Sequence, residues 1–382
     1  MSSQRRTGTA ALEKPAGPSA PADSARISAR SALLAVLFGL FLALLLAEGV
    51  ARLYVPHRFT AEQIAVLTMH TSIRGRYAAH PGLPYVLRPN YPSHNSWGWK
   101  GKEFQLKKPP GAKRVVCLGE STTYGGDKPY AESLEGFLNQ ANIPAEVLNA
   151  GVPGWTSREV LINFRERVLP LKPDLVLLYV GRNDLIPQAY NGYRPDYSHF
   201  RDPHGDFTRS NYRIKNVVRF SRLALLLVDW KPGWFGWDRV AEHPVYSTVR
   251  WENYPKPPEI VANLRDPRKT DAFRSNVEGI VSLAKERGIP VILSTLAFIP
   301  QRLKMEFLPI DPMIFEPLRV QLQRNNQAVR EAASELGAHL VDGEQLLQHP
   351  EVFTDDCHVT DRGDSLRARI FFAGILRDKL LQ

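Results

Sequence analysis

Two patterns of apolar positions divide the 382-residue chain. Ser31 to Ala47 (SALLAVLFGLFLALLLA) contains no charged residue and is apolar on every face. From about residue 113, short apolar runs alternate with segments that carry apolar residues at helical spacing. The first pattern predicts a membrane-spanning helix. The second predicts parallel strands that are joined by crossover helices.

The apolar run can continue to Tyr54 as one helix, which is long enough to cross a bilayer at about 1.5 Å per residue. Glu48 and Arg52 lie four residues apart in this extension and can pair at the interface. Few basic residues follow the run closely, whereas five precede it: Arg5, Arg6, Lys14, Arg26 and Arg30. This bias predicts a single-pass signal-anchor with a cytoplasmic N-terminus and a periplasmic or extracellular domain. The alternative is a cleaved signal peptide, for which the leader before the run is long.

Composition separates the rest of the chain into segments. Residues 1–30 are rich in Ala, Ser, Pro and Gly, which predicts a disordered cytoplasmic tail before the anchor at 31–54. Residues 55–112 carry Pro, Gly, Asn and aromatic residues, which predicts an irregular stalk or apron. We expect residues 113–382 to form one α/β domain, interrupted by an aromatic-rich insertion at 186–270.

Five short apolar runs predict the strands of this domain: RVVCLG, AEVLNAG, PDLVLLYVG, PVILSTLA and AHLVD. Helical patterns lie between consecutive runs. This alternation predicts a flavodoxin-like, doubly wound α/β sandwich with about five parallel strands. Ligands meet such a sheet at the carboxyl ends of its strands, so we expect the functional residues there.

Polar residues gather in the loops at those strand ends. Ser121 follows the first strand, Gly151 the second and Asn183 the third, and Asp355 and His358 follow the last. Acyl transfer needs a nucleophile, a base, a group that orients the base, and donors for an oxyanion. Ser121 can serve as the nucleophile, His358 as the base and Asp355 as the orienting group. The backbone N–H groups of Ser121 and Gly151 and the side-chain amide of Asn183 can bind the oxyanion.

Four ordered blocks resemble those of the SGNH/GDSL hydrolases: GES at 119–121, the Gly151 loop, GRND at 181–184 and DDCH at 355–358. The segment PNYPSHNSWGWKG also resembles the preamble of the membrane-anchored bacterial members. The resemblance covers about 113–382 without the insertion, and it implies the SGNH hydrolase fold and a serine esterase activity.

The resemblance also implies roles for single residues. Ser121 matches the nucleophile, Gly151 and Asn183 match oxyanion donors, and Asp355 with His358 matches the acid–base pair. The departure is Glu120, where Asp is commoner in the family. Because the negative charge is kept, and because the Glu120 side chain is expected to point away from the turn, the assignment of the other residues stands.

Each residue also has a structural alternative. Ser121 alone is typical of a helix N-cap, and Asn183 with Asp184 is typical of a turn. Asp355 and His358 can start a capped helix or supply half of a metal site, although the spacing of His and Cys around them does not suggest one. The ordered combination favours catalysis, and we expect no metal and no cofactor.

Cysteine use and charge limit other functions. Only Cys117 and Cys357 occur, so no disulfide framework is expected. We expect Cys117 to be a buried small residue and disfavour both a Cys117–Cys357 bridge and a Cys357 nucleophile. The formal net charge is +10, but Lys and Arg are scattered among acidic residues, which argues against nucleic-acid binding.

The insertion leaves two interpretations open. It holds the stretch AYNGYRPDYSHF, the run Leu223 to Val228, and four of the seven tryptophans: Trp230, Trp234, Trp237 and Trp251. These form either a substrate-facing lid or a core helix with packing aromatics. We expect hydrolysis of O-acyl esters on exported glycans. The alternatives are O-acyl transfer to an envelope polysaccharide, a lipid esterase, and a non-catalytic envelope-binding protein; oligomeric state has no sequence signal.

Overall fold

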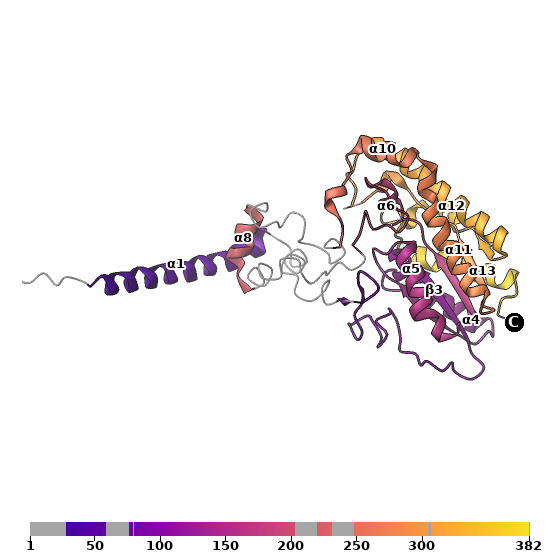
Figure 1. Cartoon of the computed structure of the whole chain (residues 1–382). Helices are drawn as coiled ribbons and strands as arrows, with labels where there is room; N and C mark the ends of the chain where they lie inside the picture. Colours follow the sequence, from indigo (N-terminus) through magenta and orange to yellow (C-terminus); the bar gives the residue numbers. More distant parts are fainter. Residues whose placement is uncertain are drawn as a thin grey trace, which may run out of the picture.

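The structure is a computed structural model that describes residues 28–58, 76–78, 80–202, 220–230, 248–304 and 307–381. It contains an α/β domain and a long N-terminal helix, α1 (Ala29–Arg58), which Figure 1 shows projecting away from that domain. Predictions for residues 1–27, for Trp234 and for Trp237 lie outside the described residues.

One five-stranded sheet forms the centre of the domain. Its order is β4-β3-β5-β6-β7, and every neighbouring pair is parallel. This order confirms the flavodoxin-like sandwich. The strands coincide with or lie within the five predicted runs, except that β3 begins one residue earlier: β3 (Lys113–Gly119), β4 (Ala145–Gly151), β5 (Leu175–Tyr179), β6 (Val291–Ser294) and β7 (His339–Val341).

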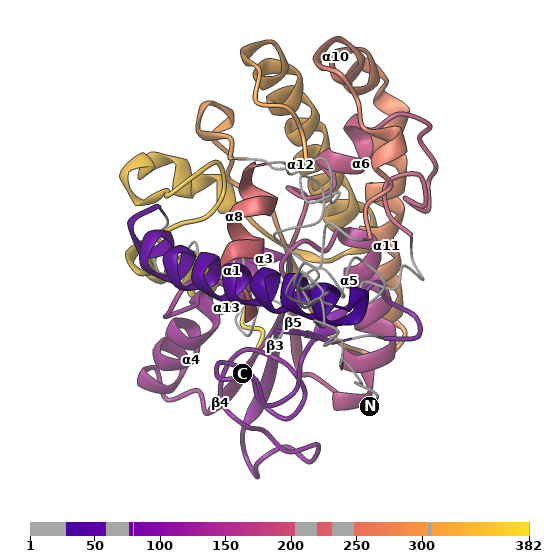
Figure 2. The same ribbon diagram turned by 90° about the vertical axis from the view of Figure 1, so that its left-hand side faces the viewer.

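Helices cover both faces of the sheet. Figure 2 shows α4 (Tyr130–Gln140) and α13 (Asp361–Arg377) on one side of β3 and β5, with α5 (Ser157–Asn163) and α11 (Asp271–Lys285) on the other. Helix α12 (Phe315–Leu336) packs against α11. Because both faces are covered, the strands are apolar at almost every position.

The short elements complete the domain. α3 (Ser121–Tyr124) and α6 (Leu185–Ala189) follow β3 and β5, α10 (Pro257–Arg265) precedes α11, and a small antiparallel pair joins β1 (Tyr77–Ala78) to β2 (Val86–Leu87). The π-helical turn Phe164–Val168 extends α5. Short 3₁₀ turns lie at Leu169–Leu171, Trp251–Asn253, Pro267–Thr270, Pro300–Arg302, Pro312–Ile314, Gly343–Gln348 and Pro350–Val352.

Alternate strand residues point into two separate cores, as the strand period requires. Val116 and Leu118 belong to the core under α5, α11 and α12, whereas Val115 and Cys117 belong to the core under α4 and α13. Cys117 is fully buried and unbridged, and Cys357 is also a free, buried cysteine. The prediction of a buried, unpaired Cys117 is confirmed.

The described chain before β3 packs on the domain from Tyr77 onward. Tyr85 and Trp99 are fully buried in the same core as Val116. The Trp155 indole donates a hydrogen bond to the Tyr85 carbonyl (3.2 Å). This part of the segment expected to be a stalk or apron therefore lies on the domain as an apron.

The insertion matches neither interpretation completely. Tyr190 and Phe200 are buried and meet edge to face with ring centroids 5.0 Å apart, and Trp251 stacks on Phe307 at 6.5 Å. These aromatic residues pack against one another. The run Leu223 to Val228 lies in α8 (Arg222–Trp230), which packs against α1, so the expectation of a helix in the domain core is wrong.

The α/β domain depends on a buried arginine at the start of β3. Arg114 is fully buried, its Nε donates to Glu146 on β4 (2.7 Å), and its other N–H groups donate to the carbonyls of Gln105, Leu106 and Leu171. The guanidinium thus ties the apron to two strand ends. Removing it leaves a buried carboxylate and three carbonyls without these partners.

We expect Arg114→Leu to lower the free energy of unfolding by about 3–5 kcal/mol, because it breaks a buried ion pair. Arg165 pairs with Glu166 (3.1 Å) on the surface, with 59% of its side chain exposed, so Arg165→Leu is a matched control with an expected change of about 1 kcal/mol or less. Urea unfolding followed by tryptophan fluorescence measures both. Equal losses in the two variants would contradict the role of Arg114.

Candidate active site

Ser121 is the first residue of α3, immediately after the strand β3 and Glu120. Glu120 occupies the N-cap position, so the Ser121 side chain does not cap the helix. Instead, Ser121 Oγ lies 2.8 Å from His358 Nε2. The helix-cap alternative for Ser121 is therefore wrong, and its hydroxyl is free to exchange a proton with the imidazole.

The other imidazole nitrogen faces a carboxylate. His358 Nδ1 lies 2.8 Å from Asp355 Oδ2, while Asp355 Oδ1 accepts the backbone N–H groups of Cys357 and His358 (2.9 and 2.7 Å). Burial raises the pKa of Asp355, but the hydrogen bonds and the charge of His358 outweigh it and hold the pKa well below its usual range. Thr360, not this pair, caps α13. The structure thus brings three predicted residues together.

Glu120 organises the loop after β5. Its carboxylate accepts three consecutive backbone N–H groups, those of Gly181 (3.0 Å), Arg182 (2.9 Å) and Asn183 (2.8 Å). It therefore points away from the nucleophile, as expected. Burial is the main reason that the pKa of Glu120 is raised to about 8, and the charge of Asp184 adds to it.

The Asn183 amide is held between two loops. Its Nδ2 donates to the Trp155 carbonyl (2.9 Å), and its Oδ1 accepts from Arg182 Nη1 (3.2 Å). The Arg182 guanidinium also binds both carboxylate oxygens of Asp356 (2.8 and 3.3 Å). An amide nitrogen has two hydrogens, so the second hydrogen of Asn183 Nδ2 remains available as a donor. The positioning roles of Glu120, Arg182 and Asp356 were not predicted from the sequence.

Asp184 joins the same loop to helix α5. It is fully buried and accepts the backbone N–H (3.0 Å) and the hydroxyl (2.5 Å) of Ser157. Burial is the largest cause of the rise in the pKa of Asp184 to about 6. Asn183 and Asp184 are therefore more than a turn, because their side chains hold the second and third loops together.

Gly151 is not placed to bind an oxyanion. Its N–H already donates to Asn149 Oδ1 (3.0 Å), and a Cβ there would lie 2.4 Å from the backbone nitrogen of Tyr124. Gly151 is therefore required for the close packing of α3 against β4, and its prediction as a donor is wrong.

Gly154, three residues further along the same loop, is the better candidate. Its φ of +79° favours glycine, and its N–H has no hydrogen-bond partner among the described residues. The neighbouring Trp155 carbonyl holds the Asn183 amide, which places the loop beside that donor. Arg201 of the insertion donates to the Gly154 carbonyl (2.8 Å). A Pro-Gly pair after the strand was the available sequence signal.

One group of side chains has atoms that metals bind: Asp355, Cys357 and His358, whose donor atoms lie within 4.8 Å of one another. Both imidazole nitrogens are already engaged by Asp355 and Ser121. Burial raises the pKa of the Cys357 thiol well above its usual value, so the thiolate that a metal requires is disfavoured. The geometry fits proton transfer better than metal binding, and it also argues against a Cys357 nucleophile.

The model of the GDSL-like Lipase/Acylhydrolase family matches residues 117–366, which include every residue of this site. The chain belongs to this family. This GDSL-family protein is an SGNH-type esterase, as predicted. No curated protein matches the chain significantly.

Solved structures similar to this GDSL-family chain include the acetyl xylan esterase AlAXEase, with 15% identity, a TM-score of 0.40 and coverage of 69% of this chain and 99% of that one. A variant of the acetyl xylan esterase Axe2 from Geobacillus stearothermophilus has 16% identity and a TM-score of 0.40, over 69% and 94% of the two chains. The lipase/acylhydrolase from Enterococcus faecalis has 15% identity and a TM-score of 0.41, over 70% and 96%.

The raised pKa of Glu120 predicts a pH dependence of stability. The folded state keeps this proton up to about pH 8, whereas the unfolded state loses it near 4.5. The free energy of unfolding should therefore fall as pH rises between these values, by up to about 1.4 kcal/mol per pH unit for this group. Glu120→Gln removes this component, so urea unfolding should show a shallower slope than in wild type. Glu132→Gln, an exposed change on α4, should keep the wild-type slope, and equal slopes in all three proteins would contradict the assignment.

Proposed function

We propose that this protein hydrolyses carboxylic O-acyl esters, with Ser121 as the nucleophile, His358 as the general base and acid, and Asp355 as the group that orients the imidazole. The observation that carries the proposal is the continuous chain of hydrogen-bond contacts from Asp355 to His358 to Ser121, with both contacts at 2.8 Å. A serine next to a base that is itself oriented by a third group is the arrangement that acyl transfer requires.

The reaction proceeds in two halves. Ser121 Oγ attacks the ester carbonyl carbon while its proton passes to His358 Nε2, and the ionised Asp355 stabilises the imidazolium that forms. Collapse of the tetrahedral intermediate releases the alcohol, which takes the proton from His358 and leaves an acyl-enzyme. Water then attacks with His358 as the base, and the carboxylic acid leaves with Ser121 restored.

Three donors suit the oxyanion of these intermediates. They are the backbone N–H groups of Ser121 and Gly154 and the free hydrogen of the Asn183 amide. The Ser121 N–H lies in the first turn of α3 and has no acceptor among the described residues. These donors are held in place before the substrate arrives, so they stabilise the developing charge without reorganisation.

The proposed substrates are O-acyl esters outside the cytoplasm, with O-acylated exported glycans as the class to test. α1 is long and apolar enough to cross a membrane, and the basic residues before it support a cytoplasmic N-terminus. The domain would then lie on the far side, in the periplasm or outside the cell. The aromatic residues Tyr190, Phe200 and Trp251 of the insertion do not strengthen the glycan assignment, because they pack against other aromatic residues of the domain.

We expect Ser121→Ala to lower kcat for short-chain aryl esters by at least about 10³-fold, because no other nucleophile replaces the hydroxyl. A fluorophosphonate probe should label the wild type and leave this variant unlabelled. Ser282→Ala, an exposed change on α11, is the matched control and should retain both activity and labelling. Equal turnover by wild type and Ser121→Ala would overturn the proposal.

The same probe tests the side of the membrane. An impermeant fluorophosphonate should label Ser121 in cells whose cytoplasmic membrane is intact, and labelling only after that membrane is permeabilised would contradict the proposed topology. Incubation with an O-acylated glycan should release free carboxylic acid. Acyl transfer to an added sugar acceptor, in place of hydrolysis, would identify the transferase alternative.

We expect Asn183→Ala to lower kcat by about 10²–10³-fold with a smaller change in KM, because the amide donor acts mainly on the transition state. Gln327→Ala removes an exposed amide on α12 and should leave both constants unchanged. Stopped-time ester assays on the two folded variants measure the difference. A change confined to KM would assign Asn183 to substrate binding instead.

A further inference from the structure

A carboxylate on the apolar helix α1 binds the beginning of α8. Glu48 accepts the Ser221 hydroxyl (2.8 Å) and the backbone N–H groups of Arg222 (2.9 Å) and Leu223 (3.0 Å). Arg52, one turn later, donates to Glu48 (2.8 Å) and to the Phe220 carbonyl (2.9 Å). A charged group beside a membrane segment is costly unless it has partners, and the amino end of α8 supplies them.

One face of α1 meets α8. Ala51 and Val55, which follow Glu48 at helical spacing, are buried, and Leu225 of α8 is buried as well. The large apolar residues from Leu33 to Leu46, and Val50, Leu53 and Tyr54 after them, are exposed on the remaining surface of α1. Leu227 of α8 is also exposed, at 46%. The two helices therefore form a unit with apolar side chains on its outside.

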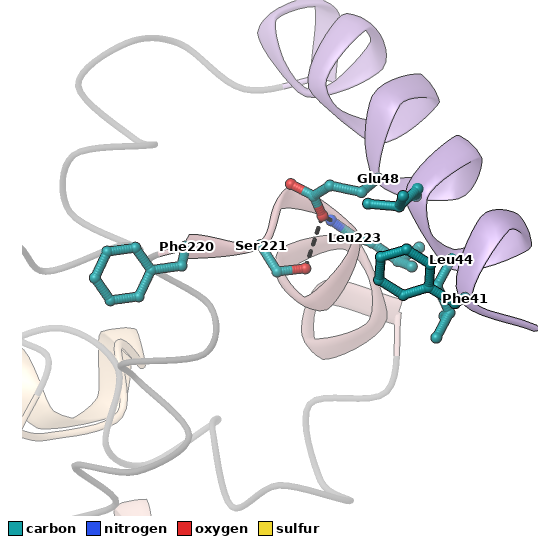
Figure 3. Close-up of a pocket in the computed structure, with 7 residues that line it drawn as sticks. Phe41, Leu44, Glu48, Phe220, Ser221 and Leu223 are labelled. Carbon is teal, nitrogen blue, oxygen red and sulfur yellow. Dashed lines mark hydrogen bonds between the residues drawn. The ribbon is translucent and has the colours of Figure 1, made fainter. Parts of the chain in front are cut away.

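An open apolar groove of about 640 Å³ runs between the two helices (Figure 3). Its volume falls within the range of about 300–1,000 Å³ that is usual for small-ligand sites. Among the described lining residues, Glu48 alone is charged, and Figure 3 shows its carboxylate turned toward Ser221. The lining residues are Phe41, Leu44, Leu45, Glu48, Phe220, Ser221 and Leu223.

The position of the groove along α1 determines what can fill it. Phe41 to Glu48 spans about 10 Å of helix, and Phe41, Leu44 and Leu45 lie inside the uncharged run that ends at Ala47. That run, Ser31 to Ala47, is about 26 Å long, close to the hydrocarbon thickness of a bilayer. If α1 spans the membrane with Glu48 at the interface, the groove extends from Glu48 to about 10 Å deeper, a depth that acyl chains occupy.

We propose that α8 and the C-terminal half of α1 form a lipid-binding surface, in which Glu48 holds α8 against the anchor and the groove takes an acyl chain of a bilayer phospholipid. This inference rests on the proposed membrane anchor. The insertion that carries α8 begins after α6 and packs on the domain as far as Arg201, which binds the Gly154 carbonyl at the active site. The docking of α8 thus gives the active-site side of the domain a second attachment to the membrane.

The first experiment compares spin labels on the full-length protein in vesicles of phosphatidylethanolamine and phosphatidylglycerol. Labels are placed at three exposed leucines: Leu227→Cys on α8, Leu37→Cys on α1, and Leu106→Cys on the apron as the matched control. The natural cysteines are buried and should not react. We expect oxygen to relax the labels at 227 and 37 more than a water-soluble nickel chelate does, and the reverse order at 106.

Each other outcome overturns the inference. If the label at 227 behaves like that at 106 while the label at 37 reports lipid, α8 lies in water and the anchor proposal stands alone. If the label at 227 is shielded from both reagents, a protein partner or a second copy covers α8. If the label at 37 also reports water, the anchor proposal fails as well. Ester turnover is measured in the same samples, so a failure of the lipid-binding surface can be distinguished from a failure of the proposed ester hydrolysis.

The second experiment tests the groove and Glu48. A phospholipid with a diazirine in its acyl chain should form adducts on residues 220–223, at the beginning of α8, and Leu44→Trp should reduce their yield by filling the groove. Leu42→Trp, an exposed change outside the lining, is the matched control and should leave the yield unchanged. Glu48→Ala should increase the mobility of the label at 227 without affecting the label at 37. Equal adduct yields in both tryptophan variants would overturn the acyl-chain site.

Discussion

The buried carboxylate of Glu120 holds together the two loops on which the active site depends. It stands directly before Ser121 and receives three backbone N–H groups from the loop that carries Asn183. The nucleophile and the amide donor are therefore fixed by one side chain between neighbouring strands. Burial makes this carboxylate costly to ionise, and the backbone donors offset part of that cost. Glu120 therefore positions the two loops and does not transfer a proton to the substrate.

Further buried polar contacts connect the remaining loops in the same way. Arg182 binds Asp356 next to the acid–base pair, and Asp184 binds Ser157 at the start of α5. Arg201 brings the insertion to the Gly154 carbonyl. Each contact joins residues that are far apart in the chain, so the site is rigid only when the whole rim of the sheet is assembled. Such preorganisation is what stabilises an oxyanion without cost during the reaction.

The anchor and the insertion are connected by a similar use of charge. Glu48 follows an uncharged run of α1, where a carboxylate needs partners, and the first turn of α8 has N–H groups that need acceptors. The Glu48 carboxylate and the N–H groups of α8 therefore supply the hydrogen-bond partners that each of them needs. This contact explains why the apolar run in the insertion packs on α1 and not in either core of the domain.

The sequence by itself determined the order of strands and helices along the chain, because each element has its own local pattern of apolar residues. The strands are nearly continuous apolar runs since both faces of the sheet are covered, and the helices have apolar residues at helical spacing. It also determined that Ser121, Asn183, Asp355 and His358 meet, since all four follow parallel strands whose ends lie at one rim. Only the tertiary structure decided that the N–H of Gly151 is already bonded, that Glu120 is a positioning residue, and that α8 belongs with α1. The Asn149 side chain that binds the Gly151 N–H is itself held by the carbonyl of Thr123 on α3, and the other two results also depend on contacts between distant segments. No local pattern of residues therefore encodes which donor remains free.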